Sequence, residues 1–202
     1  MAIFSFLQRP PKRDDILLHG SHLTLRPIRI SDAESMFDFA TDPEVTRYLP
    51  WEADTTLTAV RSWLSEQVQR RQHGHSLAFA IVDRETGVMI GSTDLMDLKV
   101  RRGQAELGYL LSRHYWNRGL MSEATTLTVD FAFRELHLQK IYAWVDQANV
   151  ASRRVLEKLG MECTDSELRF VKGERRSYLH YGLHREDWLK KEKGGTNRLS
   201  VG

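Results

Sequence analysis

One loop of this chain carries residue types that could bind an anion. Asn117, Arg118 and Gly119 stand between an apolar run over 105–111 and a helical pattern that begins after Gly119. The first N–H groups of a helix have no partner inside the helix and lie at its positive end, so they attract phosphate groups. Gly119 has no Cβ and would let an anion approach the main chain, and Arg118 adds a positive charge. The alternative is an ordinary strand-to-helix turn, because single-glycine loops are common.

Two common phosphate-binding motifs are absent from the loop. It contains neither the G-x-G-x-x-G of dinucleotide-binding folds nor the G-x-x-x-x-G-K-[ST] phosphate loop. Both motifs use several glycines to shape main-chain N–H groups around a phosphate. The sequence therefore does not predict either of those folds.

The run around this loop resembles the acetyl-CoA-binding segment of GNAT N-acetyltransferases, in their RimJ/RimL-type branch. The chain reads E-L-G-Y-L-L-S-R-H-Y-W-N-R-G-L-M-S-E-A from Glu106 to Ala124, and the branch reads roughly E-[IL]-G-Y-x-[IL]-x-x-x-x-W-x-[KR]-G-x-[AM]-[ST]-E-A. Trp116 stands where the wider family has Arg or Gln, which is usual for this branch. Met121 stands where the family has Gly or Ala, so we expect its side chain to point away from the anion.

A second block strengthens the resemblance. Residues 146–161 read D-Q-A-N-V-A-S-R-R-V-L-E-K-L-G-M, and the family writes [DN]-x-x-N-x-x-S-x-x-[VL]-x-x-K-x-G-[FM]. The resemblance covers about Leu23 to Trp188 and implies acetyl-CoA as the co-substrate. Its pantetheine arm would pair, like an added strand, with main-chain groups of Tyr109, Leu110 and Leu111. The loop would hold the pyrophosphate through the main chain of Asn117, Arg118, Gly119, Leu120, Met121 and Ser122.

Three polar side chains are candidates for the chemistry. The resemblance implies that Asn149 binds the pantetheine, with a helix N-cap as the alternative or additional role. It also implies that Ser152 donates a proton to the leaving CoA thiolate, whereas the alternative is a small residue that packs closely. We expect Glu106 to act as the base through a water molecule, because its strand, over 105–111, is expected to line the cleft that binds the substrates. The alternative is that Glu106 is a surface charge. The branch has been assigned a base in a later segment, where this chain has Phe170 and Val171.

The resemblance implies direct attack of an amine on the thioester in a ternary complex. It favours an N-terminal α-amine of a protein, such as a ribosomal protein, and leaves aminoglycosides and polyamines as alternatives. A non-catalytic acyl-CoA-binding module is an alternative of another class. The aromatic residues Tyr48 and Trp51 are expected to wall the acceptor side, with core packing as the alternative.

Composition narrows the remaining classes. The chain has 202 residues, 41% of them hydrophobic, and a net charge of +2, which suits one globular domain and not a nucleic-acid binder. A single cysteine, Cys163, forms no intramolecular disulfide and fits a reducing compartment. We therefore expect a cytoplasmic protein with no membrane span. No third ligand accompanies His73 and His75, so no metal site is expected. The oligomeric state stays open, and a homodimer is one option.

The hydrophobic pattern predicts the elements that must position these residues. Their order is β-α-α-β-β-β-α-β-α-β-β, with strands over 22–28, 77–83, 88–96, 105–111 and 140–146 and a last hairpin over 169–183. This is an α/β (α+β) GNAT fold, with a mixed, mostly antiparallel central sheet splayed between strands four and five and helices on both faces. We expect a bulge or a close backbone approach at Gly108 and a capping box over Ser31–Glu34. Residues 1–20 read as an extended lead-in, 21–189 as the domain and 190–202 as a disordered tail.

Overall fold

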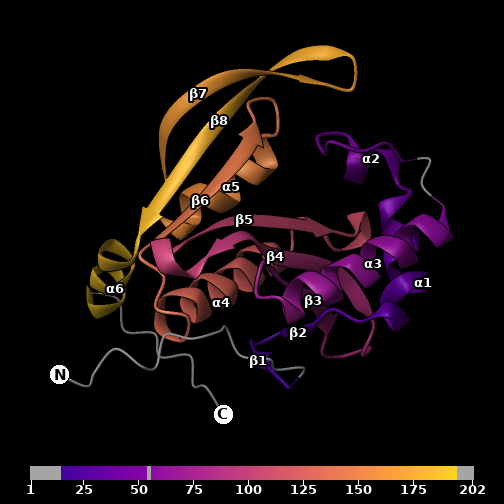
Figure 1. The fold of residues 1–202 in the computed structure, drawn as a ribbon, viewed down its shortest axis with the longest axis horizontal. Coiled ribbons are helices and arrows are strands. Elements are labelled where there is room, and N and C mark those ends of the chain that lie inside the picture. The colour runs from indigo at the N-terminus through magenta and orange to yellow at the C-terminus, as the bar shows by residue number, and fades with distance from the viewer. Residues whose placement is uncertain (1–14, 54–55, 195–202) are drawn as a thin grey trace.

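The structure, a computed structural model, describes residues 15–53 and 56–194, and these form one mixed sheet (Figure 1). The strand order is β1-β2-β3-β4-β5-β6-β8-β7, and only β5 and β6 are parallel neighbours within the described chain. The strands are β1 (Leu18–His19), β2 (Leu23–Pro27), β3 (Leu77–Asp83), β4 (Met89–Lys99), β5 (Gln104–Leu111), β6 (Lys140–Asp146), β7 (Glu162–Val171) and β8 (Glu174–His184). This confirms the predicted α+β fold.

Helices cover both faces of the sheet (Figure 1). α1 and α3 lie on one face, and α4 and α5 lie on the other, whereas α2 stands beyond the end of β5 and α6 packs beside the start of β6. Their bounds are α1 (Ala33–Ala40), α2 (Pro43–Thr46), α3 (Leu57–Gln72), α4 (Leu120–Arg134), α5 (Val150–Leu159) and α6 (Arg185–Gly194). Short 3-10 turns occupy Ile30–Asp32, Val100–Arg102 and Arg113–Tyr115.

The sheet separates two hydrophobic cores, and β3 contributes to both. Ala78 and Ala80 pack in the core under α1 and α3, whereas Phe79 and Ile81 pack in the core under α4. Successive side chains of a strand point to opposite faces. A strand that is covered on both faces therefore reads as a continuous apolar run, as the sequence does over 77–82.

β5 and β6 separate along most of their length. They pair only from Gln104↔Lys140 to Glu106↔Tyr142. β5 nevertheless remains paired with β4 as far as Leu111, and β6 with β8 as far as Asp146. The two strands therefore diverge beyond Glu106, which confirms the predicted splay. We call the gap between their diverging parts the wedge.

The predicted bulge at Gly108 is wrong. Gly108 pairs with Asp94 inside a continuous register, and the irregularity lies on β4 between Met96 and Lys99, where Asp97 has a φ of 46°. Gly108 serves close packing instead, because a Cβ at this position would lie 2.7 Å from Cε of Met96. The divergence of β5 and β6 therefore needs no kink in β5.

The predicted capping box over Ser31–Glu34 is also wrong. The box forms two residues earlier, where Asp32 accepts a hydrogen bond from the main-chain N–H of Arg29 at 2.8 Å. Asp32 also accepts one from Nη1 of Arg26 at 2.8 Å. Glu34 forms an exposed ion pair with Arg61 instead. A buried carboxylate that already binds an arginine thus fixes the start of α1.

The ends of the domain differ from their predicted positions. Within the expected lead-in, Leu18 and His19 pair with β2 as a short edge strand, and residues 1–14 lie outside the described chain. The predicted tail boundary at 190 falls inside α6, which runs to Gly194. Trp188 is buried and packs against Phe133, with ring centroids 6.3 Å apart. This anchor explains why the helix continues, whereas residues 195–202 lie outside the description.

Candidate active site

Main-chain groups of β5 point into the wedge. The N–H of Ser112 donates to the carbonyl of Ile90 at 2.8 Å, so the main-chain groups of Ser112 are directed toward β4. Hydrogen-bonded and non-bonded pairs alternate along an antiparallel ladder. Leu110 and Gly108 therefore also direct their main-chain groups to β4, and Tyr109 and Leu111 direct theirs to the other side. The prediction that the Leu110 main chain faces the wedge is wrong, because that main chain belongs to the β4 ladder.

The opposite wall of the wedge follows the same rule. The N–H of Gln147 donates to the carbonyl of Ser177 at 2.8 Å, which directs odd-numbered residues of β6 toward β8. Trp144 and Asp146 consequently direct their main-chain groups into the wedge. The Leu111 carbonyl has a partner, because the indole N–H of Trp116 donates to it at 2.8 Å. The Asp146 carbonyl accepts from the Asn149 N–H at 2.8 Å, so the groups left facing the wedge include the N–H and C=O of Tyr109 and Trp144 and the N–H groups of Leu111 and Asp146.

The start of α4 lies at the end of β5 and is open. Gly119 is the N-cap residue with a φ of 79°, and a Cβ built there would meet no atom within 4 Å. Leu120 is buried in the core, Met121 packs partly against it, and Ser122 lies in the same first turn. The Met121 side chain therefore packs against the core, which fits the expectation that it points away from the anion. Only glycine adopts this φ at little cost, so the turn exposes N–H groups directly.

Two residues precede Gly119 in the loop. Asn117 has a φ of 59°, a conformation that Asn tolerates better than most residues. The guanidinium of Arg118 lies 5.3 Å from the centroid of the Tyr115 ring. A cation near the helix start adds to the positive potential of its N–H groups.

Ser152 and Tyr109 join α5 to β5. The Tyr109 hydroxyl lies 2.8 Å from Oγ of Ser152 and 3.1 Å from the Ser152 carbonyl oxygen. Oδ1 of Asn149 accepts a hydrogen bond from the Ser152 N–H at 3.0 Å, which makes Asn149 the N-cap of α5. Burial raises the pKa of Tyr109, so its phenol stays protonated. The Ser152 hydroxyl is therefore held at the α4 and α5 side of the wedge by a protonated partner.

Glu106 lies on the opposite face of the sheet, at the last pair before the wedge. Leu110 of the same strand belongs to the core under α1 and α3, so Glu106, four residues earlier, faces that side. Burial raises the pKa of Glu106, and the nearby Arg169 opposes that shift. A carboxylate with a raised pKa is a stronger base than an exposed glutamate.

Asp94 is a second carboxyl group on this face. It pairs with Gly108 and is 8% exposed, and its Oδ1 has no hydrogen-bond partner among the described residues. Its Oδ2 accepts a hydrogen bond from the Ser92 hydroxyl at 3.3 Å. Burial raises the pKa of Asp94 to about 7. A buried charge costs free energy, so this carboxyl holds its proton more tightly than an exposed aspartate.

Aromatic rings continue this face over β6 and β8. The ring centroids of Trp144 and His180 lie 4.5 Å apart, and those of Tyr142 and His180 lie 5.7 Å apart. The guanidinium of Arg169 lies 4.0 Å from the centroid of the Trp144 ring. Burial lowers the pKa of His180, so its ring favours the neutral form.

A cavity of about 630 Å³ opens between α2 and the strand ends of β6 and β8. Tyr48 lines it, whereas Trp51 does not and is 37% exposed. The structure thus brings one of the two predicted aromatic residues to this cavity. The full lining comprises Arg47, Tyr48, Asp146, Gln147, Ala148, Arg153, Arg176 and Ser177.

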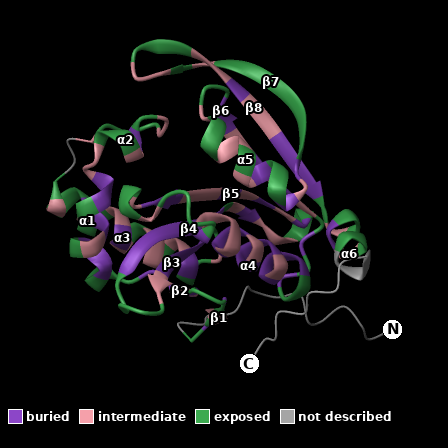
Figure 2. Ribbon diagram, turned by 180° about the vertical axis from the view of Figure 1, so that it is seen from behind, coloured by how far each residue is buried: buried purple, intermediate pink, exposed green. Residues whose placement is uncertain are grey.

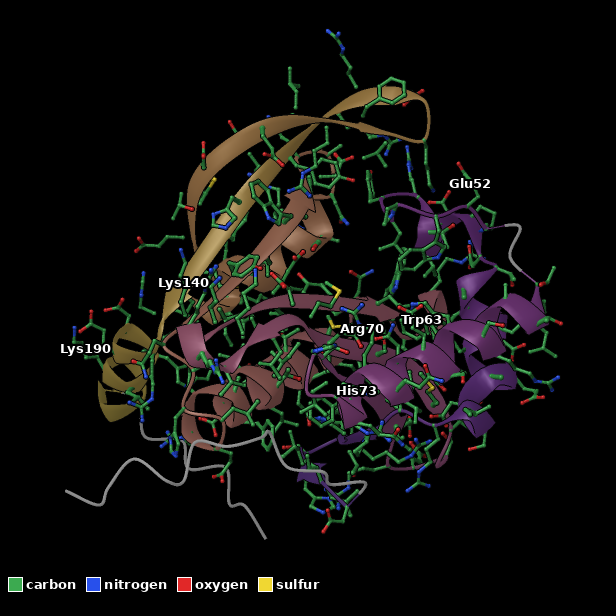
Figure 3. The ribbon with its side chains drawn as sticks, viewed as in Figure 1. Glu52, Trp63, Arg70, His73, Lys140 and Lys190 are labelled. Atoms are coloured by element: carbon green, nitrogen blue, oxygen red, sulfur yellow. The ribbon has the colours of Figure 1, made fainter. Side chains whose placement is uncertain are left out.

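The tip of the β7–β8 hairpin reaches across toward α2 (Figure 1). The Lys172 ammonium donates to the carbonyl of Thr46 at 2.9 Å and lies 3.3 Å from Oε2 of Glu52. Glu52 lies beside α2, below the hairpin tip (Figure 3). Arg176 donates to the carbonyl of Arg47 at 3.3 Å. Two segments that are more than 120 residues apart thus meet over the cavity.

Sequence reasoning missed Asp94, Trp144, Arg169 and His180. One signal could have found Arg169: a two-residue turn at Lys172 and Gly173 sets Arg169 opposite Arg176, and positive φ at both turn residues is typical of hairpins. The others carry no local motif. Among the described residues, no three His, Cys, Asp or Glu side chains converge as a metal site. None of the described helices is long and apolar enough to cross a membrane.

Comparisons with known proteins agree with this geometry. Residues 22–162 match the family model described as an acetyltransferase (GNAT) domain. The chain is 31% identical to the uncharacterized N-acetyltransferase p20 of Bacillus licheniformis over 145 residues, which cover 72% of this chain and 82% of that protein. It is 26% identical to the spermidine N(1)-acetyltransferase of Escherichia coli (strain K12), covering 84% of this chain and 89% of that protein.

Solved structures share the fold. The RimL ribosomal L7/L12 α-N-protein acetyltransferase in complex with coenzyme A superposes with a TM-score of 0.78 at 15% identity, covering 84% of this chain and 98% of that one. The ribosomal-protein-S5-alanine acetyltransferase of Vibrio fischeri superposes with a TM-score of 0.73 at 22% identity, covering 86% of this chain and 99% of that one. At these identities the likeness concerns the fold alone.

Proposed function

The chain belongs to the GNAT family of N-acetyltransferases, and we propose that it transfers an acetyl group from acetyl-CoA to the N-terminal α-amine of a polypeptide. The amine attacks the thioester directly, while both substrates are bound. N-acetyltransferase activity follows from membership of the family. The acceptor and the roles of individual residues are the proposal.

The wedge and the start of α4 fit the shape of acetyl-CoA. Pantetheine is an extended chain with two amide groups, and the main-chain groups of Tyr109 and Trp144 face the wedge with no strand of the described chain between them. The open N–H groups after Gly119 then receive the pyrophosphate. Leu111 offers its N–H, Asn149 stands at the start of α5, and Leu110 contributes only packing.

Two side chains transfer protons, and they lie beside the wedge on opposite faces of the sheet. An α-amine has a pKa near ~8, so much of it arrives protonated at neutral pH. Glu106, with its pKa raised by burial, accepts that proton through water. Ser152 donates its hydroxyl proton to the departing CoA thiolate, and Tyr109 holds Ser152 in place.

The charge of the cavity favours a polypeptide acceptor over a polyamine. Three arginines line it, and its one carboxylate, Asp146, is bound by Arg176 at 3.3 Å. A polyamine carries several positive charges and would be repelled, whereas a peptide brings carbonyl oxygens that accept from guanidinium groups. This lining is the observation that carries the choice of acceptor. Polyamines remain the second candidate, because Glu106 and Asp94 place carboxyl groups deeper on the same face.

A free-thiol assay tests both levels of the proposal. The protein is mixed with acetyl-CoA and either a set of peptides with different N-termini or a set of small amines that includes spermidine and an aminoglycoside. We expect CoA release with peptides that have a free α-amine and none with N-acetylated copies. Release with spermidine alone would overturn the acceptor assignment. Acetyl-CoA binding without release for any amine would favour a non-catalytic binding module.

A further inference from the structure

Arg169 lies on the sheet face that carries Glu106, Trp144 and His180, which we call the acceptor face. Its guanidinium lies 4.0 Å from the centroid of the Trp144 ring and 5.2 Å from that of the Tyr178 ring. These three side chains come from β7, β6 and β8, and the strand register sets them on one face. Tyr178 pairs with Asp146 of β6 and with Glu167 of β7, and Arg169 lies two residues beyond Glu167. The arginine of β7 thus rests on an aromatic platform that β6 and β8 build together.

The guanidinium retains free donors. Its Nε is bound to Glu167, and within the described part of the chain its two terminal nitrogens have no hydrogen-bond partner. The Arg169 side chain is 34% exposed, so those nitrogens can reach a ligand. An arginine held flat by aromatic rings loses little further conformational freedom when it binds a carboxylate.

A second arginine stands beside it. Arg169 pairs directly with Arg176, which lines the cavity. Like charges directly opposite each other destabilise a sheet. Glu167 partly compensates the charge of Arg169. Asp146 and Glu174 partly compensate the charge of Arg176. A bound anion would relieve the remaining repulsion. This arrangement indicates a recognition site for negative charge, next to the cavity.

The position of Arg169 connects this recognition site to the reaction. Glu106, the proposed base, pairs with Tyr142 of β6, two residues before Trp144 and on the same face, and the Arg169 guanidinium lies 4.0 Å from the centroid of the Trp144 ring. Its charge accordingly opposes the effect of burial on the Glu106 pKa. A carboxylate bound to Arg169 would therefore lie within a short distance of the amine that Glu106 deprotonates. In an N-terminal peptide segment, the side chains of the second and third residues lie at such a distance from the α-amine.

We propose that Arg169 is the acceptor-selecting residue: it binds a carboxylate at the second or third residue of the acceptor polypeptide, so the preferred substrates are acidic N-termini. This inference rests on the proposed function and deepens it. The same residue would disfavour polyamines as acceptors. The face of Trp144 would attract an ammonium group, but the guanidinium of Arg169 already covers it.

Paired peptides test the inference. The two peptides of a pair differ only at residue 2, which is Asp in one and Asn in the other, and spermidine serves as the cationic acceptor. For Arg169→Ala we expect kcat/KM to fall by about 10- to 100-fold on the Asp peptide and by less than about 3-fold on the Asn peptide, as for loss of one charge-assisted contact. Arg169→Lys should recover part of the loss. Turnover of spermidine should rise in Arg169→Ala, because the Trp144 face becomes free.

A matched control separates recognition from general charge. Arg175 is exposed and pairs with Phe170 on the other face of the same hairpin. Arg175→Ala removes the same charge and should leave the ratio of the two peptides as in the wild type. Acetyl-CoA binding by calorimetry, unchanged in each variant, shows that the domain is folded.

The outcomes distinguish this inference from the proposed function. If the wild type acetylates no peptide, the proposed function fails. If it acetylates peptides but Arg169→Ala lowers both members of the pair equally, or leaves both unchanged, the selecting role of Arg169 is wrong. An equal change of the ratio in Arg175→Ala would also overturn it, because bulk charge would then suffice.

Discussion

The half of the sheet from β1 to β5 and the half formed by β6, β8 and β7 are covered differently. On β3 the first five residues are buried, whereas eight of the ten residues of β7 are exposed and none is buried. Figure 2 shows β7 largely exposed and β4 largely buried. We call β1 to β5 the covered half and β6, β8 and β7 the open half. α1 and α3 cover one face of the first half and α4 covers the other, while α5 covers one face of the second half. The wedge lies where the two halves part.

The difference separates two tasks. The groups proposed to bind acetyl-CoA are main-chain groups and a helix start, fixed by a strand that stays paired with the covered half. The groups proposed to face the acceptor are side chains on the open half and the two residues just after α2, Arg47 and Tyr48. Close-packed cores tolerate few changes, whereas exposed side chains can change at little cost to stability. A family can thus keep one cofactor site and vary its acceptors.

The largest expected effect lies at the boundary of the two halves. Gly119→Glu should abolish measurable acetyl-CoA binding, with a dissociation constant raised at least about 100-fold, because a carboxylate would occupy the place of the pyrophosphate. Gly87→Glu is the control, since both glycines have positive φ and open space. Calorimetry measures binding and thermal melting measures folding. Retained binding would reject the phosphate site at the start of α4.

Ionisation of the buried Asp94 carboxyl, in the covered half, should lower the free energy of unfolding. The Asp94 pKa is raised from 3.8 to about 7, so its stabilising contribution is present below about pH 4 and is lost as pH rises through about 7. Asp94→Asn should remove up to roughly 4 kcal/mol of this pH dependence, at about 1.36 kcal/mol per pKa unit. Urea unfolding from pH 4 to pH 8 measures it, with the exposed Asp38→Asn as control. Parallel curves for wild type and Asp94→Asn would contradict the prediction.

Glu106 tests whether the acceptor face supplies the base. Glu106→Gln should lower kcat by about 100-fold, a typical contribution of a general base. Because its pKa is raised, the acid limb of the wild-type rate profile should lie above the usual glutamate value of 4.5, with activity increasing as pH rises through it. The limb should disappear in the variant. The exposed Glu135→Gln is the control, and an unchanged profile would remove Glu106 from the mechanism.

Ser152 tests the other side of the wedge. Ser152→Ala should lower kcat by about 10-fold, near the low end for proton transfer because a thiolate leaves readily. Its acetyl-CoA affinity should change by less than about 2-fold, since Asn149 still caps α5 through a main-chain N–H. Steady-state kinetics and calorimetry together give this separation, with the exposed Ser166→Ala as control. A loss of affinity that equals the loss of kcat would assign Ser152 to binding alone.

The smallest effect should come from the open half. Leu168 is 73% exposed, so Leu168→Ala should change the free energy of unfolding by less than about 0.5 kcal/mol. Leu156 of α5 is 1% exposed, and Leu156→Ala should cost about 2–5 kcal/mol. Urea unfolding of the two variants tests the contrast directly. Similar losses would mean that Leu168 on β7 is packed as tightly as the core beneath α5.

Much of the fold followed from local patterns. The apolar runs gave β3 as Leu77–Asp83 and β6 as Lys140–Asp146, and Asn149 and Gly160 bounded α5 as expected. These signals are local, because strand alternation, N-caps and left-handed glycines depend on a few neighbouring residues. The parallel pairing of β5 and β6 followed from the helix between them. The two motif blocks identified the family for the same reason.

The sequence by itself therefore determined the family, the order of the elements apart from β1, α2 and α6, and the glycine-marked helix start after β5. Only the tertiary structure decided which main-chain groups face the wedge, because ladder alternation depends on the register with β4 and β8. It also decided that Asp94 is buried, that Tyr109 reaches Ser152, and that Arg169 lies on Trp144. Each of these contacts joins residues on different strands or helices, and burial and electrostatics arise only when the chain brings such residues together.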